Sequence, residues 1–354
     1  MNQLFAGNHL LAQAGIGGIP LDENGSLVPL YISSDIEASN NDLALIGCWY
    51  GQDDLRLSAT MTALEWTLKS KPFPKIYIVE AAKKECKRYF SEIKDITYIQ
   101  REIRPESEGI WMKEALWSIG AREAIKDGYT KLVFIDLDCS FVHQNWVVKV
   151  SESFKKYDVI SPHICYYMSG QIDGIKKGVM VSKGYMALSG NPRGQPGMGL
   201  GMTADFFTNK LNSFIPNFAD SAGDTFFWLS LRDFSPSSPI CKSISHVMRE
   251  EDCVGIKPRP KIGHGGQVLV HHPHGLIANR NYNARAWITR ECFPRFRDGV
   301  AYFSDGMPYF SDAERGEIFK KAMGIVKSSN RFWSWEEASI MCRKLLQDAG
   351  LKTY

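Results

Sequence analysis

The stretch "KLVFIDLDCSFVHQNW", Lys131 to Trp146, joins a run of apolar residues to two closely spaced acids. Residues 132–135 have the composition of a parallel strand that is buried on both faces of a sheet. Asp136 and Asp138 follow, and because side chains alternate along an extended chain, we expect both carboxylates to point the same way. Two neighbouring carboxylates repel each other, so removing one is expected to leave the stability unchanged or to raise it. A divalent cation would relieve the same repulsion.

The segments around this strand alternate between strand and helix patterns. Residues 43–51, 75–82 and 96–103 predict strands, and residues 53–70 and 110–128 predict amphipathic helices. This alternation is typical of an α/β protein that is built on parallel strands. Ligands of such proteins bind at the carboxyl ends of the strands, where Asp136 and Asp138 would lie.

The alternation weakens after about residue 150. Residues 158–167, 178–188 and 267–275 predict further strands, and residues 190–201 predict a loop broken by glycine and proline. The tail predicts two helices, the second of which begins at Ser334 with Glu337 completing a capping box.

The composition bounds the class of protein. With 354 residues, of which 44% are hydrophobic, the chain can bury a large core. The net charge of +3 argues against a protein that binds nucleic acid or membranes through a global field. The 8 cysteines form no C-x-x-C pair, which argues against a zinc knuckle, and inside apolar segments they are expected to act as small hydrophobes. No basic leader precedes the first residues and no apolar run reaches the roughly 18 residues of a membrane span, so we expect a cytoplasmic protein.

Further polar motifs occur in a fixed order along the chain. They read W-x-K-E, D-x-D-x-x-F, G-D, H-x-x-H-G and R-x-Y-x-x-R, at Trp111, Lys113 and Glu114; Asp136, Asp138 and Phe141; Gly223 and Asp224; His271, His274 and Gly275; and Arg280, Tyr282 and Arg285. In this order the motifs resemble those of a group of GT-A-type glycosyltransferases of bacteria and phages. Ala222 and Pro273 depart from the residues usual in that group.

This resemblance implies a fold and a division of the chain. The fold would be α/β of the GT-A type, a Rossmann-like mixed sheet flanked by helices, with a helical C-terminal tail. Residues 1–42 would be an irregular extension, residues 43–150 the nucleotide-sugar-binding half and residues 151–290 the acceptor and catalytic half. Residues 291–354 would form the C-terminal helical segment.

The resemblance also implies an activity, the transfer of a sugar from a nucleotide-diphosphate donor, with a UDP-sugar expected first, to a hydroxyl acceptor. A Mn²⁺ or Mg²⁺ ion would bind the donor diphosphate and take oxygen ligands from Asp136 and Asp138. An imidazole suits Mn²⁺, and we expect it from His274, with His271 ligating or supporting the ion. Asp224 would be the general base for the acceptor hydroxyl if the reaction inverts the anomeric centre.

The remaining motif residues are expected to bind the donor. Basic side chains would contact the diphosphate, aromatic side chains would stack on the base or shape its pocket, and an acid at a strand end would bind a ribose hydroxyl. These donor-binding candidates are Lys113, Arg280 and Arg285; Trp49, Tyr50 and Trp111; and Glu80. Surface charge remains open as a simpler role for Arg280 and Arg285, and core packing for Trp49 and Tyr50, while Asp224 could instead cap a helix.

Two other classes of protein remain open. One is a haloacid-dehalogenase-like phosphohydrolase with Asp136 as nucleophile, and the other is a non-catalytic module that binds carbohydrate or nucleic acid. The acceptor also remains open, and it could be a hydroxymethylated base in phage DNA, a glycan, a protein or a small molecule. DNA is considered because the loop of residues 257–266 carries Lys257, Arg259 and Lys261 between prolines.

Overall fold

The computed structural model describes residues 42–50, 54–168, 178–181, 198–213, 215, 227–228, 231, 259–272, 282–293, 299–329, 331 and 333–353. Several predictions fall on other parts of the chain. Asp224, His274 and Arg280 lie outside the described residues, as does Lys257.

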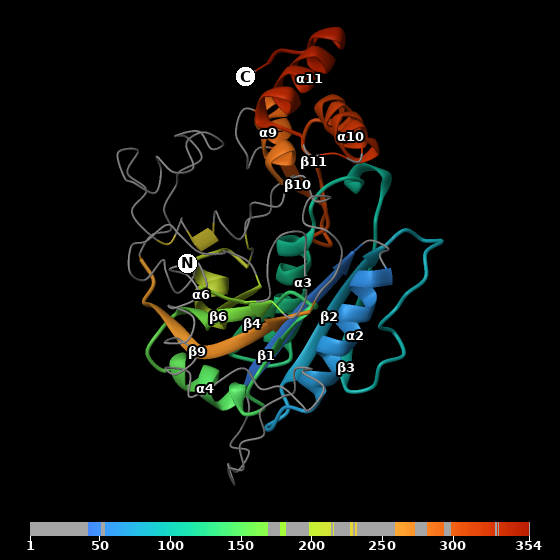
Figure 1. Cartoon of the computed structure of the whole chain (residues 1–354). Helices are drawn as coiled ribbons and strands as arrows, with labels where there is room; N and C mark the ends of the chain where they lie inside the picture. Colours follow the sequence, from blue (N-terminus) through green and yellow to red (C-terminus); the bar gives the residue numbers. More distant parts are fainter. Residues whose placement is uncertain are drawn as a thin grey trace.

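A nine-stranded mixed sheet forms the centre of the molecule (Figure 1). Its strands are β1 (Leu43–Tyr50), β2 (Lys75–Ala82), β3 (Ile96–Glu102), β4 (Lys131–Ile135), β5 (Cys139–Phe141), β6 (Val159–Met168), β7 (Gly178–Val181), β8 (Gly199–Thr203) and β9 (Ile262–His271). They are ordered β3-β2-β1-β4-β8-β6-β9-β5, and β7 pairs with β6. β3, β2, β1 and β4 run parallel, whereas β8 is antiparallel to both β4 and β6. The predicted α/β class with a mixed sheet is therefore confirmed.

The order of the first four strands creates a crevice at their carboxyl ends. The chain moves outward from β1 to β2 and β3, then returns to place β4 on the other side of β1. At such a reversal the connections leave in opposite directions, which opens the position where α/β sheets bind ligands. β1 ends at Tyr50 and β4 at Ile135, so the D-x-D sequence begins at this crevice.

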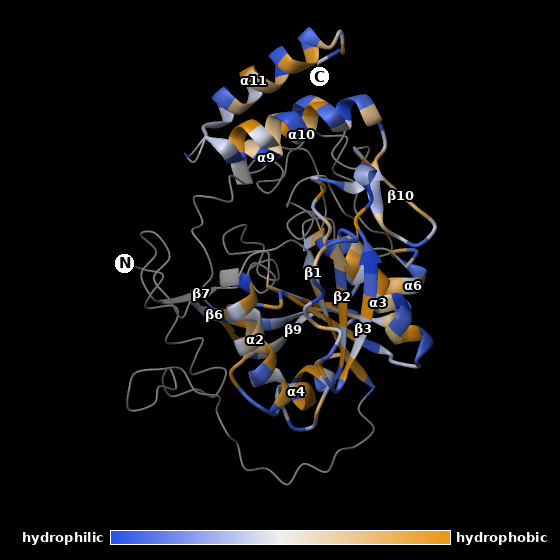
Figure 2. Ribbon diagram, turned by 90° about the vertical axis from the view of Figure 1, so that its right-hand side faces the viewer, coloured by the Kyte–Doolittle hydropathy of each residue, from blue (hydrophilic) through white to orange (hydrophobic). Residues whose placement is uncertain are grey.

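Helices cover both faces of the sheet. They are α2 (Asp54–Leu68), α3 (Lys113–Lys126), α4 (Trp146–Ser153) and α6 (Ala204–Asn209). α3 and α6 share one apolar cluster with β1 and β4, while α2 and α4 contribute to a second cluster that contains the alternate residues of the same strands. In Figure 2 hydrophobic colour runs through strands at the centre of the molecule, and the helices carry both hydrophobic and hydrophilic colours. Strands buried on both faces explain why the sequence of β1 and β4 is almost continuously apolar.

A C-terminal helical unit lies at the end of the molecule opposite α4 (Figures 1 and 2). It consists of α9 (Tyr282–Cys292), the hairpin of β10 (Val300–Tyr302) and β11 (Pro308–Phe310), α10 (Ala313–Ser328) and α11 (Trp335–Asp348). The three helices share a third apolar cluster. α11 begins with the predicted capping box, in which Ser334 and Glu337 each accept from the other's backbone amide. Because α9 packs here, the helical unit begins before residue 291.

The last residues of the predicted loop 190–201 form a strand instead, because β8 begins at Gly199, while residues 190–197 lie outside the described part of the chain. A Cβ at Gly201 would lie 2.7 Å from a side-chain carbon of Ile160, and one at Gly199 would lie 3.0 Å from Pro162. The two glycines thus allow β6 side chains to cross β8 closely. Such a contact between distant segments has no local signal in the sequence. Among the described residues, no helix is long and apolar enough to cross a membrane.

Candidate active site

The turn after β4 fixes the position of Asp136. The backbone amide of Asp136 donates to the carbonyl of Met198 (3.2 Å), and the amide of Met198 donates to Oδ2 of Asp136 (3.3 Å). Met198 has a φ of 77°, a left-handed conformation that costs a non-glycine residue on the order of 1–3 kcal/mol. A conformation of this kind persists only when its surroundings enforce it, and here it directs an amide at a carboxylate.

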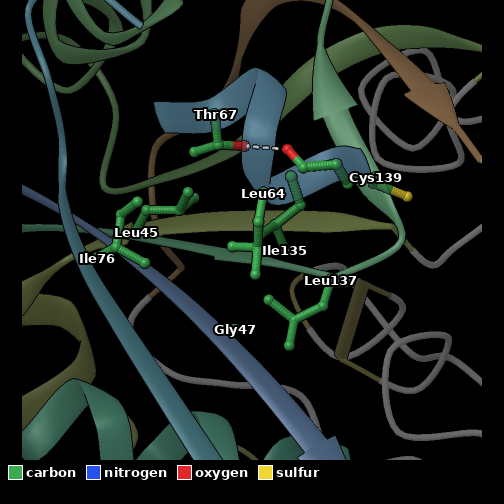
Figure 3. A pocket seen from close by; sticks show the side chains of 9 residues that line it. Leu45, Gly47, Leu64, Thr67, Ile76, Ile135, Leu137 and Cys139 are labelled. Carbon is green, nitrogen blue, oxygen red and sulfur yellow. Dashed lines mark hydrogen bonds between the residues drawn. The ribbon is translucent and has the colours of Figure 1, made fainter. Parts of the chain in front are cut away.

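Gly47 gives the same turn room to fold over the sheet. A Cβ at Gly47 would lie 2.1 Å from Cδ2 of Leu137, the residue between the two acids. Figure 3 shows Leu137 with Leu45 and Ile135 around a small apolar cavity of about 10 Å³. This cavity has little more than the volume of one water probe, so it belongs to the core and not to a nucleotide site. We expect the packing of Leu137 over Gly47 to orient the flanking acids.

We expect Gly47→Val to disturb the site through this contact. The new side chain must push Leu137 outward, and overpacking of this kind costs about 1–3 kcal/mol in the free energy of unfolding. The acids on either side of Leu137 would move with it, so divalent-ion binding should weaken as well. Urea denaturation and calorimetric ion titration measure the two effects. Gly128→Ala is the control, because a Cβ there would meet nothing within 4 Å although its φ of 95° adds local strain. Unchanged ion affinity in Gly47→Val would show that Leu137 does not orient the acids.

Asp138 is buried and makes contacts on both of its oxygens. Oδ2 lies 3.5 Å from Nε of Arg56 in α2, and Oδ1 lies 3.7 Å from Nε2 of His271 at the end of β9. The Cys139 thiol donates to the same Oδ1 at 3.5 Å. Burial disfavours the charged guanidinium of Arg56, yet Asp138 and other negative groups hold its pKa above the ordinary value. Arg56 therefore remains a cation beside Asp138.

Asp136 has a cation of its own. Lys113 is the first residue of α3 and is almost completely buried. Its Nζ lies 3.4 Å from Oδ1 of Asp136 and 4.9 Å above the ring of Trp117. The sequence alone predicted that a metal ion would relieve the repulsion between the two acids. In the structure Lys113 and Arg56 already provide part of that compensation, so each acid faces a fixed positive charge.

A group of three side chains fits a divalent ion. Ligand atoms of Asp138, Cys139 and His271 all lie within 4.8 Å of one another, and all three residues are buried. A carboxylate, a sulfur and an imidazole together suit a borderline transition-metal ion. The next residue, His272, contacts Ser140 Oγ through Nε2 (2.8 Å), and burial lowers its pKa to about 4. His272 is therefore neutral near pH 7, and its side chain is hydrogen-bonded to Ser140 in the neighbouring strand.

The aromatic candidates lie at the carboxyl end of β1. Trp49 is 3% exposed and packs edge-on against Tyr89 and Phe90, so its ring belongs mainly to the core. Tyr50 meets Trp111 edge-on, with ring centroids 5.6 Å apart. The guanidinium carbon of Arg285, from α9, lies 5.7 Å from the centre of the Trp111 ring.

Tyr50, Trp111 and Arg285 thus form a continuous contact from the sheet to the helical unit. Their roles in donor binding stay predictions.

Glu80 has a structural role that the sequence did not reveal. Its carboxylate is fully buried and accepts hydrogen bonds from the backbone amides of Tyr89 (3.1 Å) and Phe90 (3.4 Å). These bonds hold the segment after β2 against the strand end. Because the carboxylate is engaged in this way, its burial does not favour the predicted ribose contact, which remains a prediction.

The structure thus brings together Asp136, Asp138, Lys113 and His271. It adds Arg56 and Cys139, which motif reading missed. One feature of the sequence could have identified Arg56. It lies in the first turn of α2, the helix that directly follows β1 at the crevice. Asp224, His274 and Arg280 stay predictions because they lie outside the described residues.

No protein-family model matches the chain, and no curated protein matches it. Among solved structures, the 1–349 fragment of S. aureus TarS is 10% identical over 70% of this chain and 63% of that chain, with a TM-score of 0.36. The same fragment in complex with UDP-GlcNAc is 11% identical over 70% of this chain and 66% of that chain, with a TM-score of 0.37. A suggested nucleotide-diphospho-sugar transferase from Desulfovibrio desulfuricans G20 is 9% identical over 68% of this chain and 85% of that chain, with a TM-score of 0.31.

The aligned part of the chain therefore spans less than two thirds of the TarS fragment. Similarity at this level establishes neither an activity nor a ligand for this chain.

Proposed function

We propose that the chain is a metal-dependent enzyme that binds a nucleoside diphosphate at the carboxyl ends of β1 and β4. The observation that carries this proposal is the gathering of two acids, two cations and an imidazole at the point where the strand order reverses. A diphosphate with a divalent ion requires this mixture of charges, because its oxygens need cationic partners and the ion needs acidic ones.

Within that class we propose a GT-A-type glycosyltransferase, which moves a sugar from a nucleotide-diphosphate donor to a hydroxyl group. A UDP-sugar is the donor that the motif resemblance favours. Asp138 and His271 would hold the ion, with Asp136 beside them, and Mn²⁺ or Mg²⁺ is the ordinary choice for such a donor. When bound, the ion would neutralise charge on the diphosphate leaving group.

The chain's own residues would act on both sides of the scissile bond. Lys113 would bind a diphosphate oxygen and stabilise the negative charge that accumulates as the sugar leaves. Arg285, held over Trp111, would bind the outer part of the donor. Asp224 would take the proton of the acceptor hydroxyl in an inverting reaction, and this role remains a prediction from the sequence.

The acceptor is open between a glycan, a small molecule and a hydroxymethylated base in DNA. Arg259 and Lys261 of the predicted basic loop are exposed just before β9, and the backbone amide of Lys261 donates to Asp158 (2.7 Å). Nothing in these contacts favours DNA over a glycan.

Metal-dependent cleavage of a nucleotide sugar tests the proposal. We expect the purified chain to release UDP from at least one UDP-sugar when Mn²⁺ is present and to lose this activity with a chelator. Asp136→Asn should reduce turnover, because the amide keeps the shape but loses the charge that orients Lys113. Release of phosphate from simple phosphomonoesters, with no turnover of any nucleotide sugar, would instead identify a phosphohydrolase. Absence of both activities would favour a binding module.

A further inference from the structure

Three different kinds of ligand atom surround one point beside the D-x-D turn. Oδ1 of Asp138 lies 3.5 Å from Cys139 Sγ and 3.7 Å from His271 Nε2. All three ligand atoms fall within 4.8 Å of one another. The three residues are no more than 5% exposed, so these atoms are held in place by the surrounding protein.

Two of the three separations match those of ligands on a single tetrahedral ion, and the third, between Sγ of Cys139 and the imidazole, is within 4.8 Å. With ordinary Zn²⁺ bond lengths, a sulfur and a carboxylate oxygen on one ion lie about 3.6 Å apart, and an oxygen and an imidazole nitrogen about 3.4 Å apart. The observed distances of 3.5 Å and 3.7 Å differ from these values by a few tenths of an ångström at most. Small side-chain rotations would therefore complete the site.

The backbone fixes the three residues relative to one another. Cys139 and His271 are directly opposite each other in the antiparallel pairing of β5 with β9. The amide of His272 donates to the carbonyl of Asp138 (2.8 Å), which anchors the turn to the end of β9. Directly opposite residues have Cβ atoms about 4.5–5.5 Å apart, close enough for their side chains to share a ligand. Figure 3 shows the sulfur of Cys139 directed away from the apolar side chains of the cavity.

We propose that the cation centre of this chain has Asp138, Cys139 and His271 as ligands and selects Zn²⁺ or Co²⁺ over Mg²⁺. Sulfur is a poor ligand for Mg²⁺ and a good one for these ions. Binding releases the thiol proton of Cys139 to solvent and leaves the thiolate, the carboxylate and the neutral imidazole on the ion. The fourth position stays open for water or a donor oxygen.

Arg56 supports this arrangement from outside the ion. Its Nε contacts Oδ2 of Asp138, whereas the proposed ion uses Oδ1. A carboxylate that binds an ion with one oxygen and a hydrogen-bond donor with the other is held in orientation by that donor. The inference deepens the proposed function by naming the ion, and the metal site can be tested without any sugar donor.

Cobalt spectroscopy tests the sulfur ligand directly. We expect the metal-free full chain, titrated with Co²⁺, to develop a sulfur-to-cobalt charge-transfer band in the near ultraviolet. Cys139→Ala should abolish this band. Cys165→Ala is the matched control and should retain it, because Cys165 is also a buried strand cysteine but is not part of the cluster. Saturating Co²⁺ binding by the wild-type chain without the band would overturn the proposal, even if no variant could be purified.

Competition between ions gives the second measurement. Zn²⁺ binds sites with nitrogen or sulfur ligands more tightly than Mg²⁺, so the informative quantity is the change in the ratio of the Zn²⁺ affinity to the Mg²⁺ affinity. We expect Cys139→Ala to weaken Zn²⁺ binding by at least about 100-fold, at or above the range seen for residues that only support ligands. Mg²⁺ binding should change little. Equal losses for Zn²⁺ and Mg²⁺ would contradict a sulfur ligand.

The two proposals can fail separately. A cobalt–sulfur band together with no turnover of any nucleotide sugar would retain the metal site and reject the transferase. Turnover that depends on Mn²⁺, with no such band and no effect of Cys139→Ala on ion affinity, would retain the transferase and reject the sulfur ligand.

Discussion

Asp138→Asn is expected to lower the turnover of a UDP-sugar by at least about 10²-fold and to remove ion-dependent donor binding. The asparagine keeps the size of the side chain but loses the negative charge that faces Arg56 and His271. Without that charge a divalent ion would meet the Arg56 guanidinium with less compensation. Calorimetric titration of the donor, with and without Mn²⁺ or Zn²⁺, measures the loss.

The same variant tests whether the loss of the Asp138 charge raises or lowers the free energy of unfolding. Repulsion between two acids alone predicts that the metal-free variant is as stable as the wild type or more stable. The ion pair with Arg56 predicts the opposite, because a half-buried guanidinium loses its partner. We expect the free energy of unfolding to fall by about 1–3 kcal/mol, measured in urea without metal. A stability gain, or donor affinity equal to that of the wild type, would contradict the contacts assigned to Asp138.

Lys113→Met is expected to lower kcat/KM for the donor by about 10²-fold or more, the usual effect of removing one group that stabilises developing negative charge. Methionine has nearly the same length, so the packing against Trp117 can be kept while the ammonium beside Asp136 is lost. Steady-state kinetics with a UDP-sugar provide the measurement. Lys126→Met, in the last turn of the same helix and exposed to solvent, is the control and should behave as the wild type.

A structural role for Lys113 would give a different result. If Lys113 only neutralises Asp136, the variant should lose stability but keep kcat/KM within about threefold, since no transition-state contact is removed. A large fall in kcat/KM with a small change in stability would instead support the diphosphate contact.

Local sequence patterns were sufficient to predict β1 and β2, two of the strands whose carboxyl ends lie at the site. β2 has the predicted bounds, and β1 ends one residue before the predicted strand end. The proximity of Asp136 to Lys113 and of Asp138 to His271 also agrees with the motif order, because strands that run in the same direction present their carboxyl ends at one edge.

Other features depend on distant partners and could not be predicted from local patterns. β8 is a short glycine-rich strand that is specified by its neighbours β4 and β6. Cys139 has the sequence context of a core residue, and only its pairing with His271 gives it ligand neighbours. Arg56 likewise has a role only because α2 packs over the turn after β4. Tertiary contacts decide each of these cases.

The pairing of β5 with β9 also determines when the proposed ion centre could form during synthesis. Ser140 and His272, which bond through Oγ and Nε2, are 132 positions apart in the chain. Domains fold progressively as the polypeptide leaves the ribosome, and contacts of large sequence separation form late. A nascent chain that already contains β1 to β5 therefore has the two acids and Cys139 but lacks the imidazole and the opposing strand. Metal capture should accordingly mark the completion of this sheet, so that ion uptake by stalled nascent chains reports whether residues 262–271 have docked.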